Sequence, residues 1–135
     1  MSLGDTTEND VMNYIFKTTA PGWAANANFW VALYTADPGE TGTAITNETT
    51  YTSYARVSIS RTTGFTVSGN NAVNAALVQF PTSTGGATPI TYWAIVTTAS
   101  GAGQIIDRGA LSASVIPSTG VQPQFAASAL SISVD

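Results

Sequence analysis

The sequence contains no cysteine and no histidine. Without cysteine, the chain can form no disulfide framework, no zinc–thiolate site and no cysteine nucleophile. Without histidine, it lacks the most common general base, the most common metal ligand and the usual switch near neutral pH. Any catalytic chemistry would therefore have to come from carboxylates, the single lysine, tyrosines or serines.

Charge is also scarce, with four basic and eight acidic residues in 135 and a net charge of −4. Binding to a nucleic-acid backbone needs clustered Lys and Arg, so we expect no nucleic-acid partner. No apolar run approaches the roughly 18 residues of a membrane helix, and no basic, apolar segment typical of a signal peptide opens the chain. A surface rich in Thr, Ser, Ala, Gly and Asn suits packing against other proteins. The same residues are also common on the exposed faces of β-strands.

The first part of the chain is predicted to be helical. Its apolar residues fall at helical spacing: Val11, Met12, Ile15 and Phe16. Three residues are candidates for the N-cap: Asp5, Thr6 and Thr7. Pro21 and Gly22 end the pattern. A helix of about three turns is marginal by itself, so we expect its apolar stripe to dock, on its own sandwich rather than on a neighbouring subunit.

After Pro21 the hydrophobic pattern has a period of two, which is typical of strands. Strands are predicted at 28–35, 53–61, 64–68, 73–80, 90–98, 104–112, 121–125 and 129–134. Short strands separated by turn-forming segments predict an all-β fold, a β-sandwich or jelly-roll-like arrangement of about eight antiparallel strands preceded by one short N-terminal α-helix. We divide the chain into an N-terminal helical arm at 1–22 and a β-sandwich domain at 23–135.

The stretch "NFWVALYTADPG" at 28–39 has apolar residues on both faces of its strand. One face carries Phe29, Val31 and Leu33, and the other carries Trp30, Ala32 and Tyr34. We expect the first face to pack on the opposite sheet. The second would be covered by the N-terminal helix or by a neighbouring subunit.

The acidic residues form no convincing catalytic pair. A glycosidase needs two carboxylates about 5–10 Å apart across one sugar, but Asp37 and Glu40 lie in a Pro-Gly turn, where acids normally serve the turn. That turn also lacks the ligand spacing of a calcium loop. Asp107 adjoins Arg108 in a predicted strand, so their side chains point to opposite faces, and we expect Asp107 to form an ion pair or a turn hydrogen bond. We therefore predict no enzymatic activity, catalytic residue, cofactor or metal.

Five residues are candidates for contact with another protein: Trp23, Trp30, Tyr34, Tyr54 and Arg56. Trp23 follows Pro-Gly in a loop and is expected to be exposed, whereas Trp93 lies mid-strand and is expected in the core. Arg56 and Arg61 lie an odd number of residues apart and are predicted on opposite faces of a neutral strand. At least one should pair with an acid, within the fold or across a subunit contact. Arg56 is our choice for the interface.

Several stretches together resemble a known family. They are "NDVMNYIF", "FWVALYTADPGETGT", "YARVSIS", "VQFPTSTG", "ITYWAIVTTASGAGQIIDRGAL" and "FAASALSISVD". Over nearly the whole chain, they are similar to small virion proteins of tailed bacteriophages, often labelled tail fibre proteins, some of which look like capsid cement or decoration proteins. These are strand and turn signatures, and none of them is a catalytic motif.

The resemblance implies a structural protein on the capsid exterior that binds and stabilises the shell of major capsid protein. Its partners would then be the major capsid protein and itself, as a trimer or dimer. A tail fibre or tail-tip component that contacts a host surface glycan is the alternative, and a carbohydrate-binding module outside any virion is a third possibility. Copy number per particle separates the first two, because a cement protein is far more abundant than a tail part.

Overall fold

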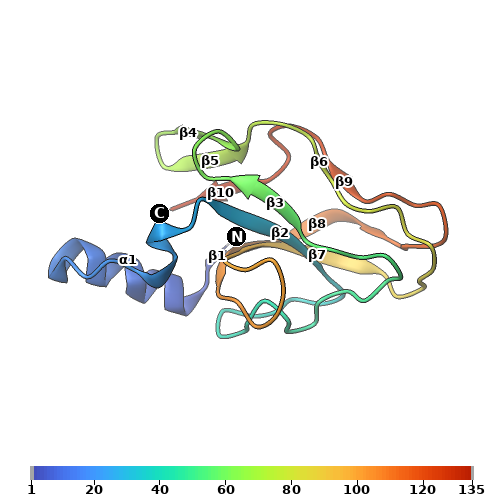
Figure 1. The fold of residues 1–135 in the computed structure, drawn as a ribbon, viewed down its shortest axis with the longest axis horizontal. Coiled ribbons are helices and arrows are strands. Elements are labelled where there is room, and N and C mark those ends of the chain that lie inside the picture. The colour runs from blue at the N-terminus through green and yellow to red at the C-terminus, as the bar shows by residue number, and fades with distance from the viewer. Residues whose placement is uncertain (1, 135) are drawn as a thin grey trace.

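The computed structural model describes residues 2–134 and confirms an all-β fold with one N-terminal α-helix (Figure 1). The elements in chain order are β1 (Ser2–Leu3), α1 (Asp5–Lys17), the short 3₁₀ helix η1 (Gly22–Ala25), β2 (Asn28–Tyr34), β3 (Val57–Ser60), β4 (Phe65–Ser68), β5 (Asn71–Asn74), β6 (Val78–Gln79), β7 (Ile90–Val96), β8 (Ile105–Val115), β9 (Gln124–Phe125) and β10 (Ser131–Ser133).

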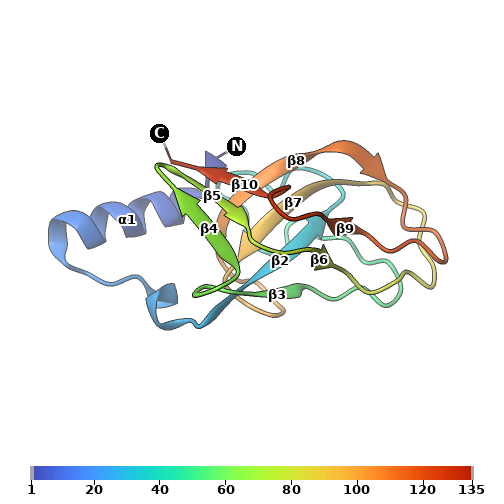
Figure 2. The ribbon, with the colours of Figure 1, turned by 90° about the horizontal axis from the view of Figure 1, so that it is seen from above.

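The strands form two layers. A five-stranded sheet has the order β1-β8-β7-β2-β3, and a three-stranded sheet β10-β5-β4 and a two-stranded sheet β6-β9 lie opposite it. All of these strand pairs are antiparallel. In Figure 1 the two smaller sheets lie above the large one, and Figure 2 shows β4, β5 and β10 grouped near the α1 end of the molecule.

The main core lies between the layers and contains one face of β2, as expected. Phe29, Val31 and Leu33 are buried there with Trp93, whose predicted core position is confirmed. The smaller sheets and the segments beside them contribute Val78, Phe80 and Leu130. Burial of large apolar side chains at about 1.5–3 kcal/mol each makes this cluster the main stabilising element of the domain.

The other face of β2 is covered by the chain itself. Tyr34 and Ala32 pack in a second buried cluster with Ala44, which lies in the long connection between β2 and β3. The Tyr34 hydroxyl donates a hydrogen bond to the Ala44 carbonyl oxygen at 2.9 Å. We expected the N-terminal helix or a neighbouring subunit to cover this face. The connection does so instead, because it is long enough to fold back over the sheet.

Helix α1 differs from its prediction in two ways. Its N-cap is Gly4, which has no side chain to serve as a cap, and the candidate Thr7 lies inside the helix, where its hydroxyl donates to the Ile105 carbonyl oxygen of β8 at 2.8 Å. A Cβ on Gly4 would lie 2.8 Å from that same Ile105 oxygen, so glycine permits the close approach. The apolar stripe does not dock on the sandwich. Only the base of α1 is held, and its end projects beyond the sheets (Figures 1 and 2).

Several predicted strands are shorter in the structure, including those at 121–125 and 129–134, which are reduced to β9 and β10. The predicted strand at 73–80 is divided into β5 and β6 by Asn74, whose buried side-chain amide donates to the carbonyl oxygens of Ala76 and Ala126. The predicted strand at 53–61 begins only at Val57, because Ser53 has a positive φ of 78°. The first strand, β1, was not predicted. It pairs with Asp107 and Arg108 of β8.

Candidate interaction surfaces

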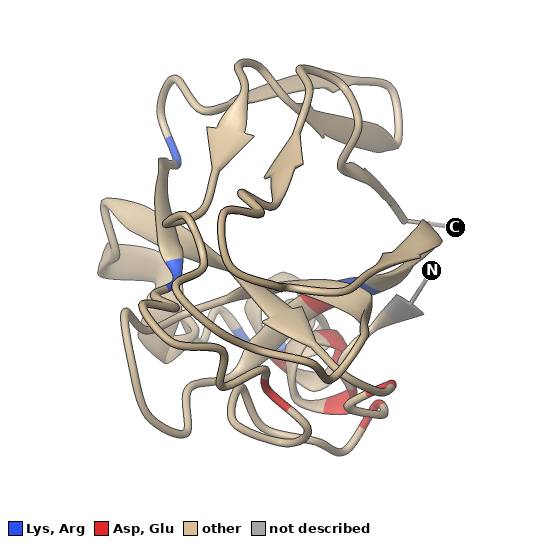
Figure 3. Cartoon of the chain, turned by 90° about the vertical axis from the view of Figure 1, so that its right-hand side faces the viewer, with Lys and Arg blue, Asp and Glu red and all other residues tan. Residues whose placement is uncertain are grey.

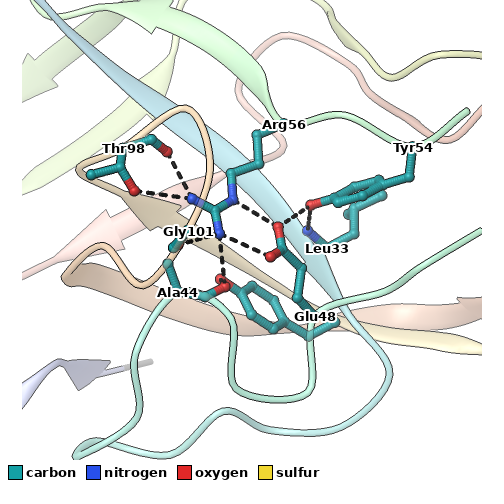
Figure 4. Close-up of polar contacts among 8 residues, drawn as sticks. Leu33, Ala44, Glu48, Tyr54, Arg56, Thr98 and Gly101 are labelled. Atoms are coloured by element: carbon teal, nitrogen blue, oxygen red, sulfur yellow. Dashed lines mark hydrogen bonds and ion pairs between the residues drawn. The ribbon is translucent and has the colours of Figure 1, made fainter.

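Arg56 is the centre of a buried polar network (Figure 4). Its Nε and Nη2 atoms donate to the two carboxylate oxygens of Glu48 at 2.7 and 2.8 Å. Nη1 donates to the carbonyl oxygen of Thr98 at 2.9 Å, and Nη2 also donates to the carbonyl oxygens of Gly101 and Ala44 at 2.8 and 3.3 Å. The Arg56 side chain is only 2% exposed. It therefore joins the β2–β3 connection to the loop between β7 and β8.

Two tyrosines extend this network into the sheet. The Tyr54 hydroxyl donates to Glu48 at 2.8 Å and accepts the backbone N–H of Leu33 at 3.1 Å. Burial raises the pKa of Tyr54 and of Tyr34 far above the usual tyrosine value, and the negative charge of Glu48 raises both further. Both hydroxyls therefore stay protonated and keep donating hydrogen bonds.

These contacts correct part of the predicted interface. Tyr34 is fully buried, and the guanidinium of Arg56 is enclosed, so neither side chain is available to another chain. Tyr54 is partly buried and uses its hydroxyl inside the fold. The prediction that Arg56 or Arg61 pairs with an acid is confirmed, but the acid is Glu48 of the same chain. A cation in a neutral region is most stable with a carboxylate nearby, and the β2–β3 connection supplies one.

Trp23 is half-buried rather than exposed, because two interactions hold it. Its indole N–H donates to Asp10 of α1 at 2.9 Å. The guanidinium of Arg61 lies 5.5 Å from the Trp23 ring centroid and 4.8 Å from that of Phe29. Arg61 also donates to three carbonyl oxygens in this segment, including that of Trp23 at 3.0 Å. Trp23 therefore fastens α1 and η1 to the sandwich. Trp30 is also partly buried, beside the second cluster.

The exposed end of α1 carries the most prominent apolar surface. Met12, Ile15 and Phe16 lie on one face at helical spacing, and all three are more than half exposed, Phe16 at 73%. Tyr14 on the next face is also mostly exposed. A contiguous apolar stripe on a projecting helix is typical of a protein–protein contact.

The layer formed by the smaller sheets carries almost no charge. Residues 62–106 and 109–134 contain no Asp, Glu, Lys or Arg. In Figure 3 the acidic residues gather at one side of the molecule, while β4, β5, β6, β9 and β10 show none. A neutral surface of this extent can pack against protein without desolvating charges.

A cleft of about 390 Å³ opens between β8 and β9. Its walls include the large apolar side chains of Trp93, Leu111 and Phe125, and no charged residue lines it. Four alanines also line it, and all are exposed: Ala110, Ala113, Ala126 and Ala129. Small side chains at these positions leave room for side chains from another molecule.

The acidic residues Asp37, Glu40 and Asp107 all interact with Arg108. Asp37 accepts the Arg108 guanidinium at 2.7 Å, and Glu40 lies 3.9 Å from the same guanidinium. The fully buried Asp107 accepts the backbone N–H of Arg108 at 2.7 Å, a hydrogen bond within strand β8 rather than in a turn. Among residues 2–134 no group of three or more potential ligands could hold a metal ion. No helix in the same range has the length and hydropathy needed to cross a membrane.

The comparison with known families agrees with the resemblance found in the sequence. The family model described as "Podophage GP4 fiber I protein gp80" matches residues 2–133. The chain belongs to this family. It is a structural protein of a phage virion, as expected from the sequence, and we refer to it below as the gp80-family chain. No curated protein matches it.

From the sequence we expected the apolar stripe of α1 to dock on its own sandwich, although segment 1–22 could also reach a partner, and nothing in the sequence marked the β8–β9 cleft. Helical spacing marked Met12, Ile15 and Phe16 as apolar, but the same spacing is typical of a helix that docks on its own core. The cleft residues come from segments up to 96 residues apart, from Leu33 to Ala129, so only the fold brings them together.

Proposed function

We propose that the gp80-family chain is a non-enzymatic subunit of a podophage fibre, attached to its neighbours through α1. The observation that carries the proposal is the projecting helix with Met12, Ile15 and Phe16 exposed. A free domain gains nothing by holding three large apolar side chains in water, whereas burying each of them in an assembly is worth about 1.5–3 kcal/mol.

The family description supports a fibre over the capsid shell, since it names a fibre protein. The charge-free layer of smaller sheets supports an assembly role, because it suits close packing in either location. The acidic residues support a structural role without catalysis, because Asp37 and Glu48 each form an ion pair with an arginine. Decoration of the capsid exterior, through the major capsid protein, is the location that we expected from the sequence. Labelling of intact virions distinguishes this location from a fibre.

Labelling of intact virions tests this proposal. Gold-labelled antibody against the gp80-family chain should bind along fibres, and its band on a gel of purified virions should be far weaker than that of the major capsid protein. Label spread over the whole shell, with a band comparable to the major capsid protein, would assign the chain to capsid decoration and overturn the fibre proposal.

A further inference from the structure

We infer that the occupant of the β8–β9 cleft is the tip of α1 from a second copy of the same chain, so that copies join head to tail. The inference rests on the proposed role of the chain as an assembling subunit and names the partner of α1. It is carried by three observations: an exposed apolar ridge, a cleft with aromatic and aliphatic walls and no charged residue, and their positions at different ends of one molecule.

The ridge is short and compact. Met12, Ile15 and Phe16 lie within about one helical turn, so their side chains occupy roughly 6 Å along the helix. Lys17 is the only charged residue between Met12 and the end of α1, and it lies in the last turn. A ridge of this size fits a local hollow, because it presents one large aromatic side chain flanked by two flexible or branched apolar ones.

The cleft offers large apolar side chains for such a ridge, together with the uncharged polar side chains of Ser112 and Gln124. Trp93 and Phe125 provide aromatic surfaces, Leu111 provides an aliphatic one, and the exposed alanines leave the mouth open. Its volume of about 390 Å³ lies within the range of pockets that hold small-molecule ligands. Because no charged side chain lines the cleft, an incoming Phe16 would desolvate no charge there.

The alternative self-contact, α1 against α1, is less well supported. Helices that associate with one another as coiled coils need apolar positions sustained over about three heptads or more. Helix α1 has 13 residues, and its exposed apolar positions cover less than two turns. Such a pair would bury little area, and the β8–β9 cleft would remain open.

The arrangement of the two surfaces also favours head-to-tail contact. Helix α1 projects from one end of the long axis, while β9 and the second half of β8 lie toward the other end (Figures 1 and 2). A copy bound through its α1 therefore leaves its own cleft free for the next copy. Contacts between two different surfaces of this kind build rings or filaments rather than closed dimers.

Cross-linking of the purified full-length chain tests the contact. The chain has no cysteine, so single cysteines can be introduced cleanly, as Lys17→Cys beside the ridge and Ser112→Cys at the cleft. A mixture of these two proteins, treated with a short bismaleimide, should give a covalent heterodimer, and each protein alone should give none above background. Val67→Cys, exposed on β4 and outside the cleft, is the matched control in place of Ser112→Cys.

Two results would overturn the inference. One is the absence of a heterodimer at concentrations of tens of micromolar. The other is equally strong cross-linking of Lys17→Cys with itself, which would indicate contact between helices. Adding Phe16→Asp to Lys17→Cys should lower the heterodimer yield at least about tenfold, as expected for a central contact residue. Phe16 lies outside the core, so this change leaves the sandwich folded.

The outcome is separate from that of virion labelling. If gold label lies on fibres but the mixed cysteine proteins do not cross-link, the fibre role stands and α1 binds a different virion protein. If the proteins cross-link but the label covers the shell, copies join head to tail on the capsid and the fibre role fails.

Discussion

Arg56 and Glu48 form a two-point ion pair, with Nε–Oε1 at 2.7 Å and Nη2–Oε2 at 2.8 Å. Burial alone would lower the pKa of Arg56, but hydrogen bonds to Glu48 and its negative charge outweigh this effect and raise the pKa. The pair joins the β2–β3 connection to the β7–β8 loop, which outside the sheets are held by the isolated bridges Tyr34–Glu48 and Thr43–Gln104. Arg56 lies in one of the stretches that resemble the phage family. It therefore stabilises the fold rather than a contact between subunits.

Replacing Arg56 should destabilise the domain strongly. Arg56→Met leaves the Glu48 carboxylate buried without its cation and removes the donor to the Thr98 carbonyl oxygen, whereas the Gly101 oxygen keeps the backbone N–H of Gly103. We expect a loss of about 3–5 kcal/mol in the free energy of unfolding, the usual cost of breaking a buried pair on one side. Urea denaturation measures it. A loss below about 1 kcal/mol would show that water replaces the guanidinium and that the pair does not hold the loops.

Tyr54→Phe tests the hydroxyl that connects this network to β2. The change removes the acceptor of the Leu33 N–H and the donor to Glu48. Leaving a buried donor unsatisfied costs about 1–3 kcal/mol. Tyr14→Phe, on the exposed side of α1, is the matched control and should change stability by less than about 0.5 kcal/mol. Equal thermal stability of the two variants would contradict the role assigned to Tyr54.

Gly109→Ala tests the packing of β8 on Trp93. A Cβ at this position would lie 2.8 Å from ring atoms of Trp93, which is buried. Overpacking of this kind costs about 1–3 kcal/mol. At Gly22 a Cβ would meet no atom within 4 Å, so Gly22→Ala should be close to neutral. The two variants differ by the same single methyl group, and their melting temperatures can be compared directly. If the two temperatures agree, the indole moves aside without cost.

The parts of the fold that were predicted correctly are those determined by local pattern. Alternation placed β2 and β7 almost to the residue, because both strands are long and apolar. β1 has only two residues, too few to show a period, and Asn74 interrupts a strand through hydrogen bonds to the distant residue Ala126. Local pattern contains no information about such partners.

The candidate surfaces show the same limit. The sequence pattern marks Tyr34 and Arg56 as candidates for contact with another protein. Their burial depends on how the β2–β3 connection folds back. Rare charges are recognisable from sequence, but whether Arg56 meets Glu48 or a partner depends on loop geometry. The family resemblance could be recognised because it runs along the whole chain, whereas the β8–β9 cleft exists only after folding.

Arg108 and Asp37 should make stability depend on pH in the acid range. Burial alone would raise the pKa of Asp37, but the backbone N–H of Gly39 and the Arg108 guanidinium outweigh it and lower the pKa below the usual 3.8. A carboxyl group whose pKa is lower in the folded state stabilises the fold above the pKa of the unfolded chain. That contribution is lost as the pH falls through the folded value. Asp37→Asn should therefore be less stable than the natural chain at pH 7, with the difference shrinking below about pH 3.8.

The expected difference at pH 7 is at most about 1 kcal/mol, because the Asp37 side chain is 43% exposed and solvent screens the pair. Arg108→Gln removes the other half of the pair and should show the same convergence at low pH. The double variant should lose less than the sum of the two single losses, since both changes remove one interaction. Urea denaturation of the four proteins at pH 7 and pH 3 measures this. If Asp37→Asn differs from the natural chain by the same amount at both pH values, the Asp37–Arg108 pair is not the source of the difference. An asparagine can also accept the turn hydrogen bond from Gly39, so loss of that bond would not explain the difference either.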